Sequence, residues 1–483
     1  MASAAQRVSL LGRKDKRTAR AGEQGRSAPA SQPLEQRILL TATMCLLAFG
    51  AVMVYSATSA TSLLQGQGNG TGYLIKYVLY GAVGLVLMRV LARDGVAKVQ
   101  SITGPLLAVS FVLVLATHVP HLGVSVNGAR RWIGPSQLQF QPSELMKLAL
   151  VLYAATLLAK RPGRVNDLRD LMKPLLFVVG GACLLVVTQP DLGTAMVIAF
   201  TTCALLIAAG IPMRNLAIIA GVTLGLVFLY ALARPYERAR LTSFINPWAH
   251  ASGSGFQAVQ GQIAIGSGGL FGAGPGQSVQ KIFYLPEAPT DFILAVIGEE
   301  LGVVGVCGLL FLYGLIAYAG LRAAKGARSL YSALIAVGAT SLIVSQAILN
   351  VFAVLGLAPL TGVPLPFVSY GSSSLIVMLA SMGLLMNVAS GGSAHVRAVA
   401  PARKRRSTQS GETRNASSRT AASGAGAAFG GSADARGREP ARWGRDQPQR
   451  QQQQQQRDED RDRRGRDRRA RGAGARGGRR AAG

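Results

Sequence analysis

Apolar residues occur along this chain in long, nearly charge-free runs separated by short polar segments. A helix of about 20 apolar residues is long enough to cross a bilayer, and most of the runs approach or exceed that length. They cover approximately residues 38–58, 73–92, 101–119, 142–158, 174–188, 193–210, 215–232, 291–320, 331–355 and 374–389. The pattern predicts an all-α polytopic membrane protein with ten transmembrane helices.

The polar segments divide the chain into a membrane domain and two tails. Residues 1–37 and 391–483 are rich in Arg, Ser, Gln, Ala and Gly, a composition that predicts disorder. The membrane domain spans residues 38–390. Its longest connection, residues 233–290, joins the seventh and eighth predicted helices, and a connection of this length is usually functional.

The distribution of charge predicts the orientation. The net charge is +29, and about half of it lies in residues 391–483. Basic residues also follow the second, fourth, sixth and eighth predicted spans. Since ten spans put both termini on one side, the positive-inside rule makes the tails cytoplasmic and the 233–290 loop extracytoplasmic. We expect the tails to meet anionic membrane lipid, and this placement favours lipid over nucleic acid.

The four cysteines all lie within apolar runs and show no paired spacing: Cys45, Cys183, Cys203 and Cys307. They are typical of small core residues and indicate neither a disulfide framework nor a metal site.

Three carboxylates mark the stretch from Tyr284 to Gly302, where a glycine-rich loop enters an apolar helix: Asp291, Glu299 and Glu300. Asp291 has two interpretations. It could be an acid favoured by the helix dipole, or a general base at a junction that faces a cavity. Glu299 and Glu300 point about 100° apart on a helix, so they cannot serve one site equally.

Other charged residues come out near the same outer face. Glu144 and Lys147 share a helix face, which fits either an internal ion pair or a cation that meets a lipid head group. Asp191 is either a turn or N-cap residue or part of a site. The predicted outward cations could hold phosphate or simply reach the membrane interface: Arg130, Arg131, Arg238, Arg240 and Lys281.

A glycine-rich segment, residues 266–276, resembles a phosphate cradle but lacks the Lys-Ser/Thr of a P-loop. We interpret it as a flexible substrate loop. The whole set of residues would suit polymerisation of a lipid-linked sugar, although the residues alone do not exclude ion or lipid transport.

Seven segments, in order, resemble the SEDS family (shape, elongation, division and sporulation): 127–135, 141–147, 189–194, 244–248, 266–276, 284–302 and 364–374. The resemblance covers about residues 38–389 and, at 279–288, is closest to the cell-division (FtsW) branch. It implies a ten-helix peptidoglycan glycosyltransferase that polymerises lipid II. Asp291 matches the essential acid proposed as general base. The family often has His where this chain has Pro289, so no role for that His carries over.

The resemblance also implies substrate-binding positions. Glu144, Lys147 and Asp191 match polar cavity residues, and Arg240 and Ser369 match motif positions. With Arg130 and Lys281 from the charge pattern, these complete the candidate substrate-binding set. A divalent cation, Mg²⁺ or Mn²⁺, could assist at the pyrophosphate, but no metal ligands are identified.

The expected partners are a class B penicillin-binding transpeptidase and other divisome proteins, at the septum of the bacterial cell membrane. The alternative function is a lipid II flippase. That transporter would place polar groups at mid-membrane and on both faces, whereas the ionisable motif residues here gather on the outer side. A weaker alternative is a division scaffold that acts mainly through the tails.

Overall fold

The computed structural model describes residues 33–392 except 67–69, 121, 127–128, 136–138, 161–171, 283 and 286. The predicted tails therefore lie almost wholly outside the described residues. The first helix already begins at Leu34, inside the segment predicted to be the N-terminal tail.

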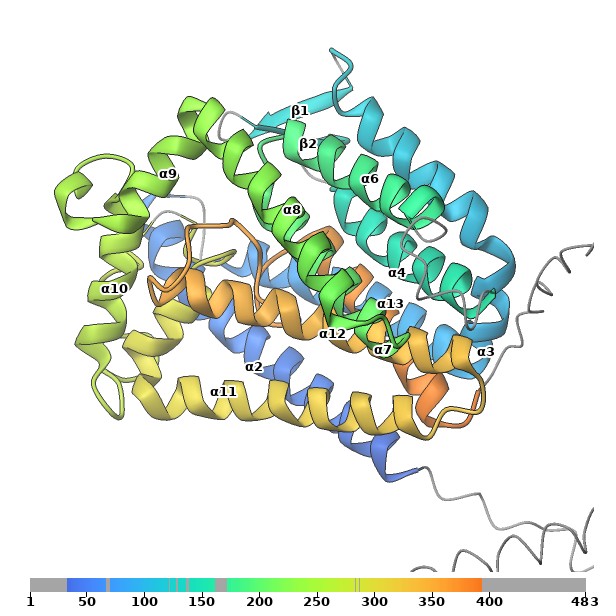
Figure 1. Cartoon of the computed structure of the whole chain (residues 1–483). Coiled ribbons are helices and arrows are strands. Elements are labelled where there is room, and N and C mark those ends of the chain that lie inside the picture. The colour runs from blue at the N-terminus through green and yellow to red at the C-terminus, as the bar shows by residue number, and fades with distance from the viewer. Residues whose placement is uncertain are drawn as a thin grey trace, which may run out of the picture. The chain divides into compact units, whose positions relative to one another are not determined.

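The described chain is mostly helical (Figure 1). Its helices are α2 (Leu34–Leu64), α3 (Thr71–Ala116), α4 (Pro142–Lys160), η1 (Met172–Leu176), α6 (Phe177–Thr188), α7 (Leu192–Ala208), α8 (Met213–Ala233), α9 (Pro235–Ile245), η2 (Trp248–His250), α10 (Phe256–Gly268), α11 (Ile293–Lys325), α12 (Leu330–Val354) and α13 (Ser372–Ala389). Six of them are long and apolar enough to cross a membrane: α2, α3, α4, α11, α12 and α13.

Helices α4, α12 and α13 form the buried centre. Helix α13 packs along α3, and α12 packs against α4, α7 and α11. The outer helices α3 and α11 expose large apolar side chains, among them Val86 and Phe311, which are 66% and 65% exposed. Apolar surface of this kind suits contact with lipid tails, so the protein is embedded in a membrane.

Helix α3 covers two of the predicted spans and breaks between them at Asp94, whose φ of −130° and ψ of 19° are not helical. Asn387 of α13 bonds the main chain at this break. Its Nδ2 donates to Ala92 O at 2.9 Å and to Arg93 O at 2.5 Å, while Val96 N donates to its Oδ1 at 3.4 Å. The last helix thus satisfies polar groups that the break leaves free.

The prediction of an all-α chain misses a small antiparallel hairpin, β1 (Gly123–Val126) and β2 (Ala129–Ile133). The segment joining its strands, 127–128, is Asn-Gly, a dipeptide typical of two-residue hairpins, flanked by β-branched and aromatic residues. The pairing register shifts between Val124 and Ser125, so Trp132 and Arg130 pair with β1 while Arg131 is an extra residue at a β-bulge.

The long 233–290 connection, predicted as a loop, is partly helical. Helix α9 begins with Pro235, whose missing N–H costs nothing at a first helical position. Helix α10 packs on α11 at the end of the bundle where α11 begins (Figure 1).

Helix α11 breaks at Gly302, where φ is +66° and ψ is −162°, a conformation open essentially only to glycine. The glycine-rich segment fills the break: Val303 N donates to Gly269 O at 3.0 Å, and Ala273 N donates to Glu299 O at 2.9 Å. The segment 266–276 was predicted to be a flexible substrate loop. In the structure its main chain forms hydrogen bonds with the main chain of α11.

Candidate active site

Asp291 lies in a turn just before α11. The N-cap of α11 is Phe292, so Asp291 does not cap the helix. Asn350 Nδ2 of α12 donates to the main-chain oxygen of Asp291 at 2.7 Å, and Tyr370 N donates to Pro289 O at 2.9 Å. Two neighbouring segments therefore fix the turn, in which Asp291 as a whole residue is half-buried.

The surroundings of Asp291 make its carboxyl group a stronger base than a carboxylate in water. Burial and the nearby Glu287 raise the pKa of Asp291 from 3.8 to about 6, while Thr290 and Arg240 act in the opposite direction. Thr290 Oγ1 lies 3.1 Å from Asp291 Oδ1 and 3.0 Å from Glu287 Oε2. A carboxylate with a pKa near 6 can both accept a proton and lose it again near neutral pH.

Asp191 and Arg131 form a second group. Asp191 is the N-cap of α7, with Oδ1 accepting from Thr194 N at 3.1 Å, and Gln141 Nε2 donates to its Oδ2 at 3.2 Å. Arg131 Nη1 lies 3.9 Å from Asp191 Oδ1, and this arginine also donates to the carbonyl oxygens of residues 189 and 190. The guanidinium is held by the loop that precedes α7.

Gly362 connects this group to Asp291. A Cβ at Gly362 would lie 3.9 Å from Arg131 Nη1 and 3.9 Å from Asp291 Oδ2, so the two side chains flank this glycine. Its φ of +66° is a conformation that L side chains rarely adopt. Residues 131, 191 and 291, far apart in sequence, thus come together around one turn.

Helix α9 contributes Arg240 and Glu237 to the same region. Arg240 Nη1 donates to Leu360 O at 3.2 Å. Glu237 is 2% exposed, and its Oε1 accepts no hydrogen bond from the described residues. Burial raises the pKa of Glu237, while the positive charges of Arg240 and Arg131 lower it. Sequence reasoning missed Glu237; its spacing of three residues from Arg240 on one helix was the available signal.

Glu144 and Lys147 form a buried ion pair within α4. Lys147 Nζ lies 2.9 Å from both Glu144 carboxylate oxygens, and the two side chains are 2% and 0% exposed. Lys147 Nζ also donates to Gln346 Oε1 of α12 at 2.7 Å. The internal pair is the interpretation that the geometry favours for these two residues.

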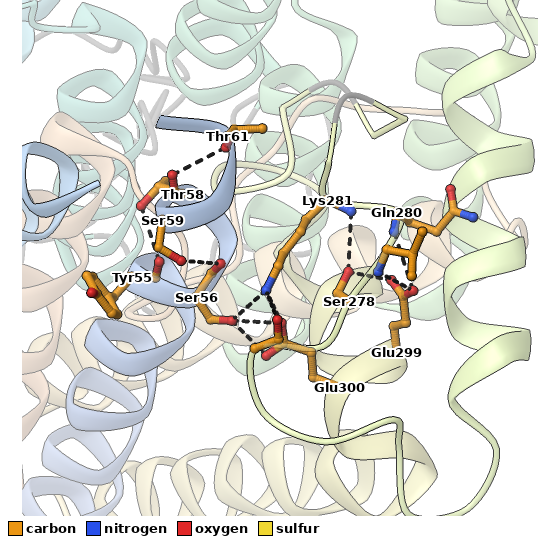
Figure 2. A network of polar contacts seen from close by, with 12 residues as sticks. Tyr55, Ser56, Thr58, Ser59, Thr61, Ser278, Gln280, Lys281, Glu299 and Glu300 are labelled. Atoms are coloured by element: carbon orange, nitrogen blue, oxygen red, sulfur yellow. Dashed lines mark hydrogen bonds and ion pairs between the residues drawn. The ribbon is translucent and has the colours of Figure 1, made fainter. Parts of the chain in front are cut away.

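Lys281 lies in a different cluster (Figure 2). Its Nζ donates to Glu300 Oε1 at 2.7 Å, to Ser56 Oγ of α2 at 3.1 Å and to Gly276 O at 2.9 Å. These contacts use all three ammonium hydrogens. Glu299 points the other way, and its carboxylate accepts from Ser278 Oγ at 2.5 Å and Val279 N at 2.9 Å. The two glutamates serve different partners, as their spacing predicts.

Arg130 and Ser369, the remaining candidates, make no described contact with the Asp291 side chain. Arg130 is exposed on the hairpin. Ser369 is 3% exposed and its Oγ accepts from Leu365 N at 2.8 Å, so it stabilises the turn between α12 and α13. The four cysteines are free thiols, and the prediction that they are core residues is wrong: Cys45 and Cys307 are exposed, and Cys183 and Cys203 are half-buried.

Within the described ranges, no three His, Cys, Asp or Glu side chains gather as metal ligands would. Mg²⁺ and Mn²⁺ prefer several oxygen ligands. A divalent cation at this site therefore remains a prediction that rests on the family resemblance.

The fold and the site define a multi-spanning helical membrane protein with an ionic site built from its helix ends and connecting segments. A family model described as a cell cycle protein, FtsW/RodA/SpoVE, matches residues 36–393. The chain belongs to this family.

Curated relatives and solved structures agree with this assignment. The chain is 37% identical to stage V sporulation protein E of Bacillus subtilis, over 73% of this chain and 96% of the relative. It is 40% identical to a protein of Coxiella burnetii named probable peptidoglycan glycosyltransferase FtsW, over 73% and 95%.

Among solved structures, one from a study of polymerisation and crosslinking by a peptidoglycan synthase complex matches with a TM-score of 0.60 and 30% identity, over 73% of this chain and 96% of that one. The rod shape determining protein RodA of Thermus thermophilus matches with a TM-score of 0.53 and 30% identity, over 73% and 95%.

Proposed function

We propose that this chain is a peptidoglycan glycosyltransferase that polymerises lipid II into glycan strands during septal cell-wall synthesis, with Asp291 as general base. One arrangement supports the assignment of the base: the half-buried Asp291, whose surroundings raise the pKa of its carboxyl group to about 6, flanks Gly362 together with Arg131. A proton acceptor next to fixed cations is what transfer of a sugar from a pyrophosphate requires.

In the proposed reaction, the 4-hydroxyl of the acceptor N-acetylglucosamine attacks the anomeric carbon of the donor. Asp291 takes the hydroxyl proton as the new C–O bond forms. The bond between the anomeric carbon and the pyrophosphate oxygen breaks, and undecaprenyl pyrophosphate leaves with that electron pair. Inversion of the α-linked donor gives a β-1,4 bond.

Arg131 and Arg240 are the cations that we assign first to the pyrophosphate. A guanidinium pairs with phosphate through a planar fork of donors, and both are held in place by main-chain carbonyls. Substrate contacts by the other candidates stay predictions: Glu144, Lys147, Asp191, Arg130, Lys281 and Ser369.

The topology that we propose has ten spans, with both termini in the cytoplasm. At 1.5 Å per residue the 46 residues of α3 would extend about 69 Å, twice what a bilayer core of about 30 Å requires. Counting α3 as two spans and adding the three shorter apolar helices to the six long ones gives ten. The meeting of residues 131, 191, 240 and 291 supports the placement of their connections on one side, the extracytoplasmic one.

The proposed partners follow the same assignment. We expect a class B penicillin-binding transpeptidase to act with this chain, along with divisome proteins at the septum of the cell membrane. Residues 1–32 and 393–483, outside the described part, would meet anionic lipid or division proteins on the cytoplasmic side.

Polymerisation of lipid II by the purified full-length chain, with and without the transpeptidase, tests the proposal. We expect glycan strands from the wild type and from D94N, which removes an exposed carboxylate at the bend of α3, and none from D291A. Full-rate polymerisation by D291A would refute the role of Asp291. Movement of lipid II across vesicles without polymerisation by any preparation would favour the flippase.

A further inference from the structure

Helix α12 carries two buried amides, Gln346 and Asn350, which are 0% and 1% exposed. They are four residues apart and so share one face of the helix. Polar side chains in an apolar span are costly unless they form hydrogen bonds, so their partners indicate why they are there.

Each amide donates both of its N–H groups, and the acceptors lie on the segment between α12 and α13, on the first turn of α13 and on the Asp291 turn. Gln346 Nε2 donates to Pro364 O at 3.0 Å and to Ser374 Oγ at 3.1 Å. Asn350 Nδ2 donates to Val363 O at 2.8 Å and to Asp291 O at 2.7 Å. The two amides therefore fix the chain next to Gly362 and join it to the main chain of Asp291.

The side-chain oxygens of Gln346 and Asn350 differ in their hydrogen bonding. Gln346 Oε1 accepts from Lys147 Nζ at 2.7 Å. An ammonium group can only donate, so Lys147 fixes the amide with its nitrogen toward residue 364. Asn350 Oδ1 is buried and accepts no hydrogen bond from the described residues. The described contacts of the Asn350 side-chain amide are therefore made by its nitrogen, which donates to residues 363 and 291.

We infer that Gln346 and Asn350 are positioning residues for Asp291, and that the buried Glu144–Lys147 pair acts on the site through Gln346. This inference rests on the proposed function. Lys147 Nζ orients Gln346, Gln346 holds residue 364, and Asn350 ties residue 363 to the carbonyl of Asp291. The carboxylate of Asp291 is thereby held in place relative to Gly362 and Arg131.

Steady-state polymerisation of lipid II by full-length N350L tests the first part. A misplacement of about 1 Å can cost about 100-fold in rate, so we expect kcat to fall about 10- to 100-fold while KM changes less than about threefold. T340V is the matched control, because Thr340 is buried on the same helix and its hydroxyl has no partner among the described residues. It should keep the wild-type kcat.

A double-mutant cycle tests the second part. Lys147 is replaced together with its partner, as E144Q/K147M, because one buried charge left alone is strongly destabilising. If the pair acts through Gln346, adding Q346L should lower kcat no further than the worse of the two variants. Multiplied losses would show that the pair acts independently of Gln346, and a rise in KM for E144Q/K147M would show direct contact with substrate; either result would overturn this part.

Unchanged kcat in N350L, or an equal loss in T340V, would overturn the first part. A wild type that makes no glycan strands while remaining folded would instead refute the proposed function, so the two failures are distinguishable.

Discussion

Lys281 Nζ of the long connection lies 2.7 Å from Glu300 Oε1 of α11, and the two side chains are 2% and 1% exposed. Removing one partner of a buried pair leaves an uncompensated charge and typically costs about 3–5 kcal/mol. We therefore expect K281M to lower the free energy of unfolding by about this amount. The thermal unfolding midpoint of the detergent-solubilised protein measures the loss.

The Asp94–Lys98 pair is the matched control. Its side chains are 70% and 66% exposed, and exposed pairs contribute about 0–1 kcal/mol. K98M should therefore leave the midpoint nearly unchanged. If K281M is as stable as K98M, the network in Figure 2 does not stabilise the fold.

The raised pKa of Asp291 predicts how activity depends on pH. Below pH about 6 the carboxyl group is protonated and cannot accept the proton of the sugar hydroxyl, so kcat/KM should rise as pH rises through about 6. Because the negative charge of Glu287 helps to raise this pKa, E287Q should move the rise to lower pH. Initial rates of lipid II polymerisation between about pH 5 and 8 measure both midpoints. An E287Q midpoint at or above the wild-type value would contradict this electrostatic assignment.

Gly302 is the position in α11 least able to take a side chain. A Cβ there would lie 2.5 Å from Gly272 N and 2.5 Å from Leu270 O, and the backbone conformation alone costs other residues about 1–3 kcal/mol. We expect G302A to lower the thermal midpoint sharply or to abolish recovery of folded protein. G308A is on the same helix, and nothing lies within 4 Å of a Cβ at that position. Its thermal unfolding midpoint should equal that of the wild type or lie slightly above it, because alanine has the higher helix propensity. Equal thermal midpoints for G302A and G308A would contradict the break in α11 at Gly302.

Arg131 and Arg130 are adjacent in sequence but differ in surroundings. Arg131 faces Asp191 and Gly362, whereas Arg130 is exposed. We expect R131A to lower kcat/KM for lipid II at least about tenfold more than R130A, since a fixed, partly desolvated guanidinium contributes more than an exposed one. R131K should restore little, because lysine lacks the planar fork of donors. Equal losses in R130A and R131A would place both cations on the substrate.

The helical membrane fold and its six long apolar helices were predictable because they depend on one strong signal, the length of apolar runs. Where the run around Asp94 is interrupted by charge, the structure has a break. The divergence of Glu299 and Glu300 also followed from helix geometry alone. The candidate site was recognisable through motifs, and the structure brings Asp191, Arg240 and Asp291 to one region.

What could not be predicted depends on contacts between distant segments. The sequence does not say which arginine of the 130–131 pair points inward, since that depends on a β-bulge in the hairpin and on how the hairpin packs. Glu237 carries no motif, and its burial depends on where α9 packs. Lys281 looked like an outward cation because its partners, Ser56 and Glu300, lie 225 and 19 residues away.

The bond between Asn387 and the break in α3 has a consequence for biosynthesis. The amide reaches carbonyls made 294 and 295 residues earlier. At about 5–20 residues per second, a ribosome needs about 15–60 s to cover that distance. Throughout that interval the nascent bend lacks this amide, so its carbonyls need another hydrogen-bond donor. A chain released before residue 387 would therefore leave the break in α3 without the hydrogen bonds that α13 supplies.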